Sequence, residues 1–285
     1  MIDKIIKENT FVRTYNSLHE FLAHTDRTVI PEELRYYNKD TLDTISDNEH
    51  SSWRYGSDEN LTNFIKTRTN PNRARDLCKN AISQKTNSKE YKDLLRMSLT
   101  HRKKPKITDI GGRISVSHAV SGEEKYFIQT KAASRPTVKI GINLCVSAMV
   151  DADDLIKISQ QAIPTVYLLE AAGIATEICM CTFSTGLYDR EDDDQYNTVF
   201  EVPIKTAQQR FNWSTFSPVF SSGTYRYNFF RSWCMVQDKR VTSGLGSPMA
   251  DSIVGLLAQK LGYTAIIGVN NAGMFDKIRE IFGKK

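Results

Sequence analysis

The sequence of 285 residues lacks any apolar run near the roughly 18–20 residues needed to span a bilayer. Its opening segment, MIDKIIKENT, has no apolar core like that of a signal peptide. Proline is scarce, at 8 residues, while 40% of the residues are hydrophobic and 25% are charged. We therefore expect a globular, soluble chain that stays in the cytoplasm where it is made, with one large domain or two.

Cysteine is also scarce, and the number of cysteines is odd. They are Cys78, Cys145, Cys179, Cys181 and Cys234. Most fall in predicted core elements, which predicts reduced thiols. No second pair of cysteines or histidines with zinc-like spacing accompanies Cys179 and Cys181, so the sequence does not indicate a zinc site.

Signatures of catalysis are missing as well. The sequence contains no G-x-S-x-G nucleophile motif, and no cysteine or serine can be assigned to a histidine by a family pattern. The loop T-S-G-L-G-S-P at 242–248 precedes a predicted helix but has neither a Walker lysine nor G-x-G-x-x-G spacing, which favours a plain loop over an anion site. We predict no catalytic residues, and nothing in the sequence speaks for an enzyme.

The best-ordered pattern in the chain predicts a strand, a helical crossover and a second strand. Apolar residues alternate with polar or small ones over 138–147, as in a half-buried strand. Residues 154–172 show helical spacing, with Gly173 as C-cap and Pro164 predicting a kink or two short helices. Residues 174–183 are almost continuously apolar, as in a strand covered on both faces. Together they predict a right-handed βαβ unit and an α/β fold.

This order of a strand, a polar turn and a helix ending in Leu-Leu-Glu-Ala-Ala-Gly (168–173) resembles the opening of a von Willebrand factor A-like domain. More narrowly, it resembles phage-encoded proteins of uncharacterised function that carry such a domain behind a helical N-terminal segment. The resemblance covers about half of the chain. It implies a Rossmann-like, mostly parallel sheet flanked by helices, and the host cytoplasm as the location.

In such domains the first strand commonly ends in D-x-S-x-S, which holds a divalent cation. The matching positions here are Asn143, Cys145 and Ser147, of which only Ser147 is retained. Asn and Cys are poorer ligands for Mg²⁺ than a carboxylate and a hydroxyl. The resemblance thus implies a degenerate cation site at Asn143, Ser147 and Asp151, although acidic residues over 151–154 are more simply explained as a helix start. We predict no cofactor, with Mg²⁺ as the alternative.

The other core elements are predicted from shorter patterns. Residues 113–120 and 126–130 predict a hairpin leading into the core, and 197–206 predict a strand in which Pro203 favours an edge or a bulge. A helix, a last strand and a closing helix are predicted at 249–261, 263–269 and 273–282. We expect Asn270–Asn271 and the predicted cation ligands at the carboxyl ends of the strands, where open α/β sheets place ligands.

Nine aromatic residues crowd 211–233. Tyr225, Phe229 and Trp233 recur at every fourth position, which predicts a helix buried against the sheet. Any exposed part of this aromatic segment would mark a surface for a partner or for self-association.

Residues 1–112 are predicted as a helical, basic N-terminal region, and 113–285 as the von Willebrand A-like core. The first predicted helix covers 14–24, where Ser17 and Glu20 have the spacing of a capping box. Further helices are predicted to start near Ser57, Pro71 and Ser88.

Positive charge is concentrated in this N-terminal region. Residues 61–106 contain 13 basic and 3 acidic residues, a local net charge of +10. Such a cluster predicts contact with nucleic acid, while a solvated face and a protein partner remain the alternatives. The predicted nucleic-acid-binding residues are Arg73, Arg75, Lys79, Lys92, Arg96, Arg102, Lys103, Lys104 and Lys106.

Two functions follow from these patterns. The first is a phage-type, non-enzymatic accessory protein that binds single-stranded DNA or RNA through the basic region and uses the α/β core for assembly. The second is a module that binds a host or phage protein, or itself as an oligomer, without nucleic acid. Binding that weakens steeply with salt would favour the first function over the second.

Overall fold

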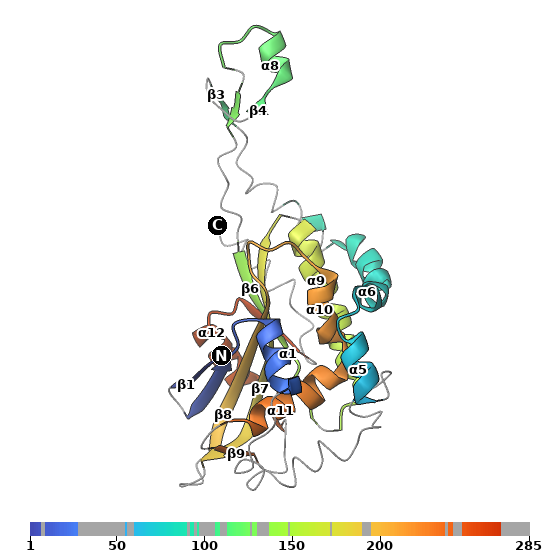
Figure 1. Cartoon of the computed structure of the whole chain (residues 1–285). Coiled ribbons are helices and arrows are strands. Elements are labelled where there is room, and N and C mark those ends of the chain that lie inside the picture. Colours follow the sequence, from blue (N-terminus) through green and yellow to red (C-terminus); the bar gives the residue numbers. More distant parts are fainter. Residues whose placement is uncertain are drawn as a thin grey trace.

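A computed structural model describes the chain over residues 1–6, 9–27, 55, 60–89, 92–93, 96, 106–108, 113–125, 127–129, 137–147, 149–171, 173–189, 195–236, 239–241 and 247–268. Helices cover a large twisted sheet, and a small second sheet is drawn apart from this body (Figure 1). Within the described part of the chain, no helix combines the length and the apolar character that crossing a membrane requires.

The predicted βαβ unit is confirmed. Its elements are β6 (Thr137–Asn143), α9 (Ala152–Ala171) and β7 (Ala175–Asp189). The two strands pair in parallel along the whole of β6. α9 is one helix that continues through Pro164, so the alternative of two short helices is wrong. Gly173 adopts the left-handed φ of 87°, and the N–H of Ile174 donates to the carbonyl of Leu169 at 3.0 Å, which closes the helix as predicted.

The main sheet contains eight strands in the order β1-β2-β8-β7-β6-β11, with β9 and β10 also paired to β7. The strands not yet given are β1 (Ile2–Ile6), β2 (Thr10–Thr14), β8 (Gln195–Lys205), β9 (Lys239–Val241), β10 (Ser247–Pro248) and β11 (Ala265–Ile267). β2–β8, β7–β6 and β6–β11 are parallel, but β1–β2, β8–β7, β7–β9 and β7–β10 are antiparallel. The prediction of a mostly parallel sheet is therefore wrong, and the sheet is mixed. Only residues 190–194 separate β7 from β8, too few for the crossover that a parallel pair requires.

Strands β1 and β2 were not predicted, and they join the start of the chain to the same sheet as the predicted core. The main sheet therefore contains strands from both sides of the predicted boundary at residue 112. Arg13 of β2 is only 1% exposed. Its guanidinium donates to both carboxylate oxygens of Asp3, at 2.8 and 2.6 Å, and to the carbonyl of Ser232 at 2.7 Å. Arg13 can be buried in β2 because its charge is paired and its N–H groups have acceptors.

Pro203 lies at a bulge, as predicted. Cys179 pairs with Pro203 and the preceding Ile178 pairs with Lys205, so Ile204 is the extra residue on β8. β8 is nevertheless an interior strand between β2 and β7. The bulge lets a proline, which has no N–H to donate, stay within a central ladder.

Helices cover both faces of the main sheet (Figure 1). One face packs against the larger apolar cluster, which includes side chains of α9, while the other packs against α12 (Asp251–Lys260) through Val254 and Leu257. α6 lies against α9 as an outer layer. The helices on the α9 side are α1 (Leu18–Arg27), α5 (Leu61–Thr67), α6 (Pro71–Thr86), α10 (Trp213–Phe216), η2 (Ser217–Phe220), η3 (Thr224–Phe229) and α11 (Phe230–Cys234).

The aromatic segment forms a buried helix, as predicted. Tyr225, Phe229 and Trp233 are each at most 3% exposed. The first half, η3, is a π-helix, and α11 continues it. Gly223 immediately precedes η3 and allows close contact, because a Cβ there would lie 2.8 Å from a ring carbon of Phe64.

The N-terminal helices follow their predicted caps in part. The Ser17 hydroxyl accepts from the N–H of Glu20 at 3.1 Å, which confirms one half of the capping box at α1. The Glu20 carboxylate accepts from the N–H of Asn16 at 2.6 Å, one residue before the predicted position. α5 starts later than predicted, with Asn60 as its N-cap. Ser57 lies outside the described residues, as does most of the predicted helix at 88–99.

The predicted hairpin at 113–130 is confirmed in part, because residues 113–114 pair antiparallel with 127–128, but 116–120 form a short helix and the pair belongs to the small sheet and not to the main sheet. Its residues form β4 (Arg113–Ile114), the short helix α8 (Val116–Val120) and β5 (Phe127–Gln129), and β5 pairs with β3 (Lys106–Thr108) and β4 in the separate sheet. Val116 and Val120 are 71% and 82% exposed. The Ser115 hydroxyl bonds to Nδ1 of His118 at 2.8 Å, a local contact that competes with the strand pattern.

Candidate functional site

α6 begins with a strong start signal next to the basic region. Asn70 precedes the helix, and its side-chain oxygen accepts from the N–H of Asn72 at 3.0 Å. Pro71 is the first helical residue, a position where a missing N–H costs nothing. The hydroxyl of Ser217 donates to the carbonyl of Asn70 at 2.8 Å and ties this start to η2. The orientation of α6 on the body is therefore fixed at its N-terminal end.

The two sides of α6 differ in character. Ala74 and Cys78 are fully buried, and Arg75 and Lys79 are exposed. The two cations are four residues apart, so they lie on one face, about 6 Å apart along the helix axis. α6 thus presents a pair of cations to solvent from a helix anchored on α9.

Other predicted nucleic-acid-binding residues extend this exposed charge. Lys92 and Arg96 are exposed, and Arg96 is 3.7 Å from Asp93 in a surface ion pair. Arg73 is half-buried and donates to the Thr67 hydroxyl at 3.3 Å. Surface pairs of this kind contribute little to stability, so Arg96 can exchange its partner for a phosphate at small cost.

The basic run HRKKPK at 101–106 falls largely outside the described residues. Arg102, Lys103 and Lys104 lie outside them. Lys106 is the first residue of β3 in the small sheet. Of the predicted set, the structure groups Arg73, Arg75 and Lys79 on one helix.

Arg68 is an exception within the basic region, because it belongs to the interior. It is 6% exposed, and its guanidinium makes an ion pair with both oxygens of Asp26 on α1. Asn228 of the π-helix donates to the same carboxylate at 2.9 Å. Arg68 therefore connects α5, α1 and η3 and is not available to a ligand.

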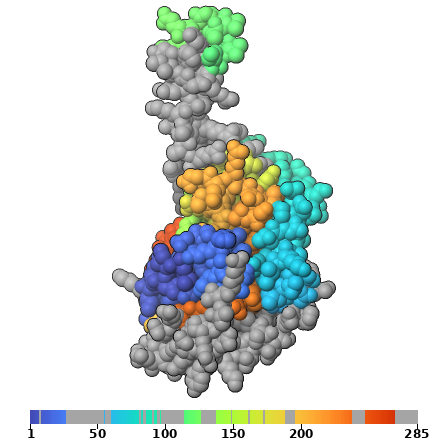
Figure 2. Space-filling model, in the orientation of Figure 1, coloured from blue at the N-terminus to red at the C-terminus, as the bar shows by residue number. Residues whose placement is uncertain are grey.

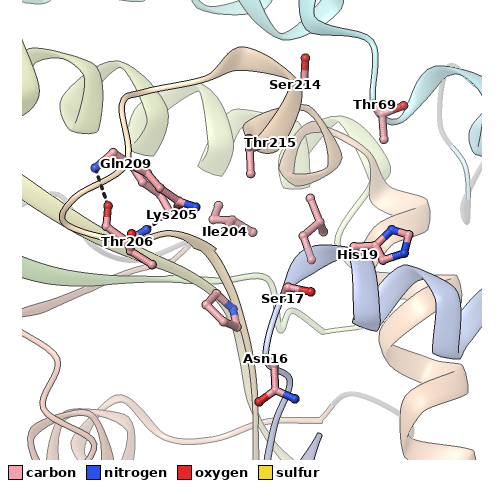
Figure 3. A pocket seen from close by; sticks show the side chains of 12 residues that line it. Asn16, Ser17, His19, Thr69, Ile204, Lys205, Thr206, Gln209, Ser214 and Thr215 are labelled. Atoms are coloured by element: carbon pink, nitrogen blue, oxygen red, sulfur yellow. Dashed lines mark hydrogen bonds between the residues drawn. The ribbon is translucent and has the colours of Figure 1, made fainter.

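A groove lies where the parallel strands β2 and β8 end (Figure 3). It consists of two adjoining pockets of about 400 and 330 Å³, which share Ile204, Lys205, Gln209 and Thr215. The first pocket is bounded by the start of α1, the turn before α6 and the start of α10. The second continues toward Arg210 and Phe211. Pockets of this size accommodate small ligands or single groups of larger ones.

The floor of the groove is fixed by a buried ion pair. Lys205 is 3% exposed. Its ammonium lies 2.6 Å from Glu170 of α9 and donates to the carbonyls of Thr176 at 2.7 Å and Thr206 at 3.1 Å. The same Glu170 oxygen accepts from the N–H and hydroxyl of Thr176. All three ammonium protons are used, so Lys205 organises the floor and offers no charge to a ligand.

Apart from Lys205, the first pocket is lined by polar and apolar side chains, the apolar ones being Leu18, Pro203 and Ile204. Ser17, Thr69, Ser214 and Thr215 contribute hydroxyls, and His19 adds an imidazole (Figure 3). The side-chain oxygen of Gln209 accepts from the N–H of Thr206 at 2.9 Å, which leaves its amide donors for a ligand. Such walls favour a neutral polar group, because an anion requires positive charge to offset its desolvation.

An aromatic cluster borders the second pocket. Tyr167 of α9 is 38% exposed, and its ring stacks on Trp213 with centroids 6.1 Å apart. Phe211 contacts both rings edge-on and stacks on the buried Phe216 at 4.5 Å. Phe211 and Trp213 are partly exposed. The cluster therefore has a buried anchor and a partly exposed surface.

A separate pocket, away from the groove, lies at the carboxyl ends of β6 and β11. These neighbours are parallel, with α9 on one face and α12 on the other, which is the crevice where open α/β sheets bind ligands. A pocket of about 270 Å³ there is lined by Asn143, Ser147 and Asp251 among others. Asp151 does not line it, and Asn270–Asn271 lies outside the described residues.

Asn143 is already committed to the backbone. Its side-chain oxygen accepts from the N–H of Cys145 at 3.1 Å and of Phe183 at 3.2 Å, which occupies both lone pairs. Its amide donors remain for the pocket. Within the residues that the structure describes, no three His, Cys, Asp or Glu side chains come together as a metal site. The Mg²⁺ alternative stays a prediction that relies on Ser147 and Asp151.

The cysteines are all buried reduced thiols, as predicted. Burial raises the pKa of Cys145 to about 12 and that of Cys179 to about 11. A thiol in such a setting is protonated at neutral pH and is a poor nucleophile.

A family model matches residues 3–267, a stretch that starts in β1 and ends with β11. The chain belongs to the DUF7192 family, described as a domain of unknown function. No curated protein and no solved structure matches the chain. The DUF7192 match includes α6 and all of the main sheet except the first residue of β1. The groove therefore lies within the family domain.

Three features of this DUF7192 chain were missed in the sequence. Lys205 and Glu170 lie far apart in the chain, so no local pattern joins them. Tyr167 appears as one more apolar position of α9. Asp251 follows the loop at 242–248, which we interpreted from the sequence as a plain loop. Phe211 and Trp213 are partly exposed members of the aromatic segment, and the partner surface predicted for such residues stays a prediction.

Proposed function

We propose that this protein is a non-enzymatic accessory protein that binds single-stranded nucleic acid through its basic N-terminal residues, with the α/β sheet as a platform for assembly. The observation that carries the proposal is the exposed pair Arg75 and Lys79 on α6, a helix held rigidly against the body. Lys66, Lys89, Lys92 and Arg96 are exposed as well. Cations presented in this way neutralise phosphates and release counterions.

The charge balance of the region supports the same proposal. Residues 61–106 carry a net charge of +10, whereas the whole chain carries +5. The rest of the chain is therefore net negative, and a polyanion would be steered toward this region.

The proposed platform is a degenerate von Willebrand factor A-like domain of the kind seen in phage proteins. The parallel run β7-β6-β11 and the crossover helix α9 support this relationship. A phage origin would place the protein in the host cytoplasm.

Affinity for defined oligonucleotides tests the proposal. Fluorescence anisotropy with labelled single-stranded DNA, single-stranded RNA and duplex at low salt should show binding below micromolar for a single strand. Arg75→Ala/Lys79→Ala should weaken it about 5- to 30-fold, because each lost contact is worth roughly 0.5–1 kcal/mol.

The matched control is Lys157→Ala/Lys260→Ala, which removes two exposed cations from α9 and α12. It should bind within about twofold of the wild type. Both double variants remove the same two positive charges, so a larger loss in the α6 variant reports the position of the cations and not the net charge. Equal losses in the two double variants, or no binding to any strand, would sink the proposal.

A second candidate is self-assembly or protein binding without nucleic acid. β1 is one of the two edge strands of the main sheet among the described residues, and its Ile2 and Ile5 are 60% and 58% exposed. Outer strands with exposed apolar residues pair readily with other chains. Light scattering coupled to size exclusion should then give an oligomer that Ile5→Lys converts to a monomer, and a wild-type monomer would count against it.

A further inference from the structure

We infer that the groove and the aromatic cluster beside it seat unpaired bases of the bound strand, while the cations of α6 and Arg210 hold its phosphates. This inference rests on the proposed function and names the part of the nucleic acid that the site recognises. Three observations carry it: the partly exposed rings, the first pocket, in which the lysine is already paired, and the position of the exposed cations around both.

The rings have the properties of a stacking platform. Tyr167, Phe211 and Trp213 come from α9 and from the segment that leads into α10, and they contact one another. The buried Phe216 holds Phe211 from beneath, so the cluster is ordered before any ligand arrives. Bases stack on such rings without regard to sequence, because every base has a π-face.

The first pocket fits the base and sugar better than the phosphate. Its one central cation, Lys205, is neutralised by Glu170 and saturated with acceptors. The hydroxyls of Ser17, Thr69 and Thr215 suit the edges of bases and the oxygens of a sugar. A phosphate in the first pocket would find no unpaired lysine or arginine among the lining residues.

Positive charge lies beside the first pocket. Arg210 is exposed at the second pocket, next to Phe211. α6 contacts both α9 and α10, the helices that supply Tyr167 and Trp213. The segments of α6 and α10 lie side by side on one face of the molecule (Figure 2). A strand crossing this face would pass from the cations of α6 to the rings and the groove. A duplex cannot use the rings, because its bases are stacked and paired.

Tyr167→Ala and Trp213→Ala test the inference with a labelled oligo(dT) strand and a duplex of equal length. Each variant should weaken single-strand binding about 5- to 150-fold, the range measured for loss of base stacking, and leave duplex binding within twofold. Leu256→Ala is the matched control, since Leu256 is 46% exposed on α12 at the other face of the sheet. It should change neither affinity.

Trp213→Phe keeps the inference testable if the alanine variants fold poorly. It should retain single-strand affinity within about threefold, while the quenching of tryptophan fluorescence that we expect of the wild type on binding should largely disappear. Circular dichroism of each variant establishes that it is folded.

Two failures are distinguishable. If the wild type binds neither DNA nor RNA, the proposed function fails and this inference fails with it. If binding persists and depends on Arg75 and Lys79 but ignores Tyr167 and Trp213, or if duplex binds as well as single strand, the base subsite is overturned and the proposed function stands.

Discussion

Replacing Lys205 by methionine should destabilise the fold more than most single changes. The side chain is 2% exposed, and its ammonium lies 2.6 Å from Glu170 with two carbonyl acceptors at 2.7 and 3.1 Å. Methionine fills similar space but leaves a mostly buried carboxylate without its cation. Removing one partner of a buried pair costs about 3–5 kcal/mol. At roughly 2–4 °C per kcal/mol, the melting temperature should fall by about 6–20 °C.

Urea unfolding of four proteins measures this effect: the wild type, Lys205→Met, Glu170→Gln and the double variant. Glutamine keeps an oxygen for Thr176 while removing the charge. The double variant should be less destabilised than the sum of the single variants by about 1–3 kcal/mol, because no charge is left unpaired. A loss under about 1 kcal/mol for Lys205→Met, or simple additivity, would refute this account of the groove floor.

Two further predictions concern packing and pH. Gly223→Ala should lower the free energy of unfolding in urea by about 1–3 kcal/mol, because its Cβ would lie 2.8 Å from the ring of Phe64. Adding Phe64→Leu to this variant should recover part of the loss. An unchanged urea midpoint for Gly223→Ala would contradict the close packing. Burial, and then the charge of Arg13, lowers the pKa of His24 below 6.5. The unfolded chain therefore takes up this proton first, so stability is full above about pH 6.5 and falls as the pH drops below it. His24→Gln should flatten the fall in urea midpoint between pH 7.5 and 5, and an equally steep fall in the variant would show that His24 is not its source.

The βαβ unit and the buried aromatic helix could be predicted because their apolar residues repeat along the sequence with one clear period. Strands β6 and β7 and helix α9 bury one or both faces, and Tyr225, Phe229 and Trp233 mark a single helix face. Gly173 and Pro203 also acted as local geometry dictates, one as a helix cap and the other at a bulge. Local chemistry was sufficient for these features.

Other features depend on contacts between distant residues. Strand β2 contains Arg13, which appears exposed until Asp3 and Ser232 are brought beside it. The alternation at 113–120 suggested a strand, yet Val116 and Val120 are largely exposed in a short helix. The antiparallel direction of β8 is the one of these features that the sequence could have predicted, because the link from β7 is too short for a parallel crossover.

The candidate site shows the same division. The exposed cations of α6 follow from its helical period, because Ala74 and Cys78 define the buried side. Arg68 has the same charge but is drawn inside by Asp26 of α1, a partner that lies 42 residues away. The groove could not be predicted, since its walls come from segments around residues 17, 69, 205 and 215.

The salt dependence of single-strand binding tests the central claim most directly. The logarithm of the association constant should fall linearly with the logarithm of salt concentration, with a contribution of about 0.7 per phosphate contact. Arg75→Ala/Lys79→Ala should therefore lower the magnitude of the slope by about 1.4, while Lys157→Ala/Lys260→Ala leaves it unchanged. An identical slope in the wild type and the α6 variant would contradict the claim that this helix holds the phosphates.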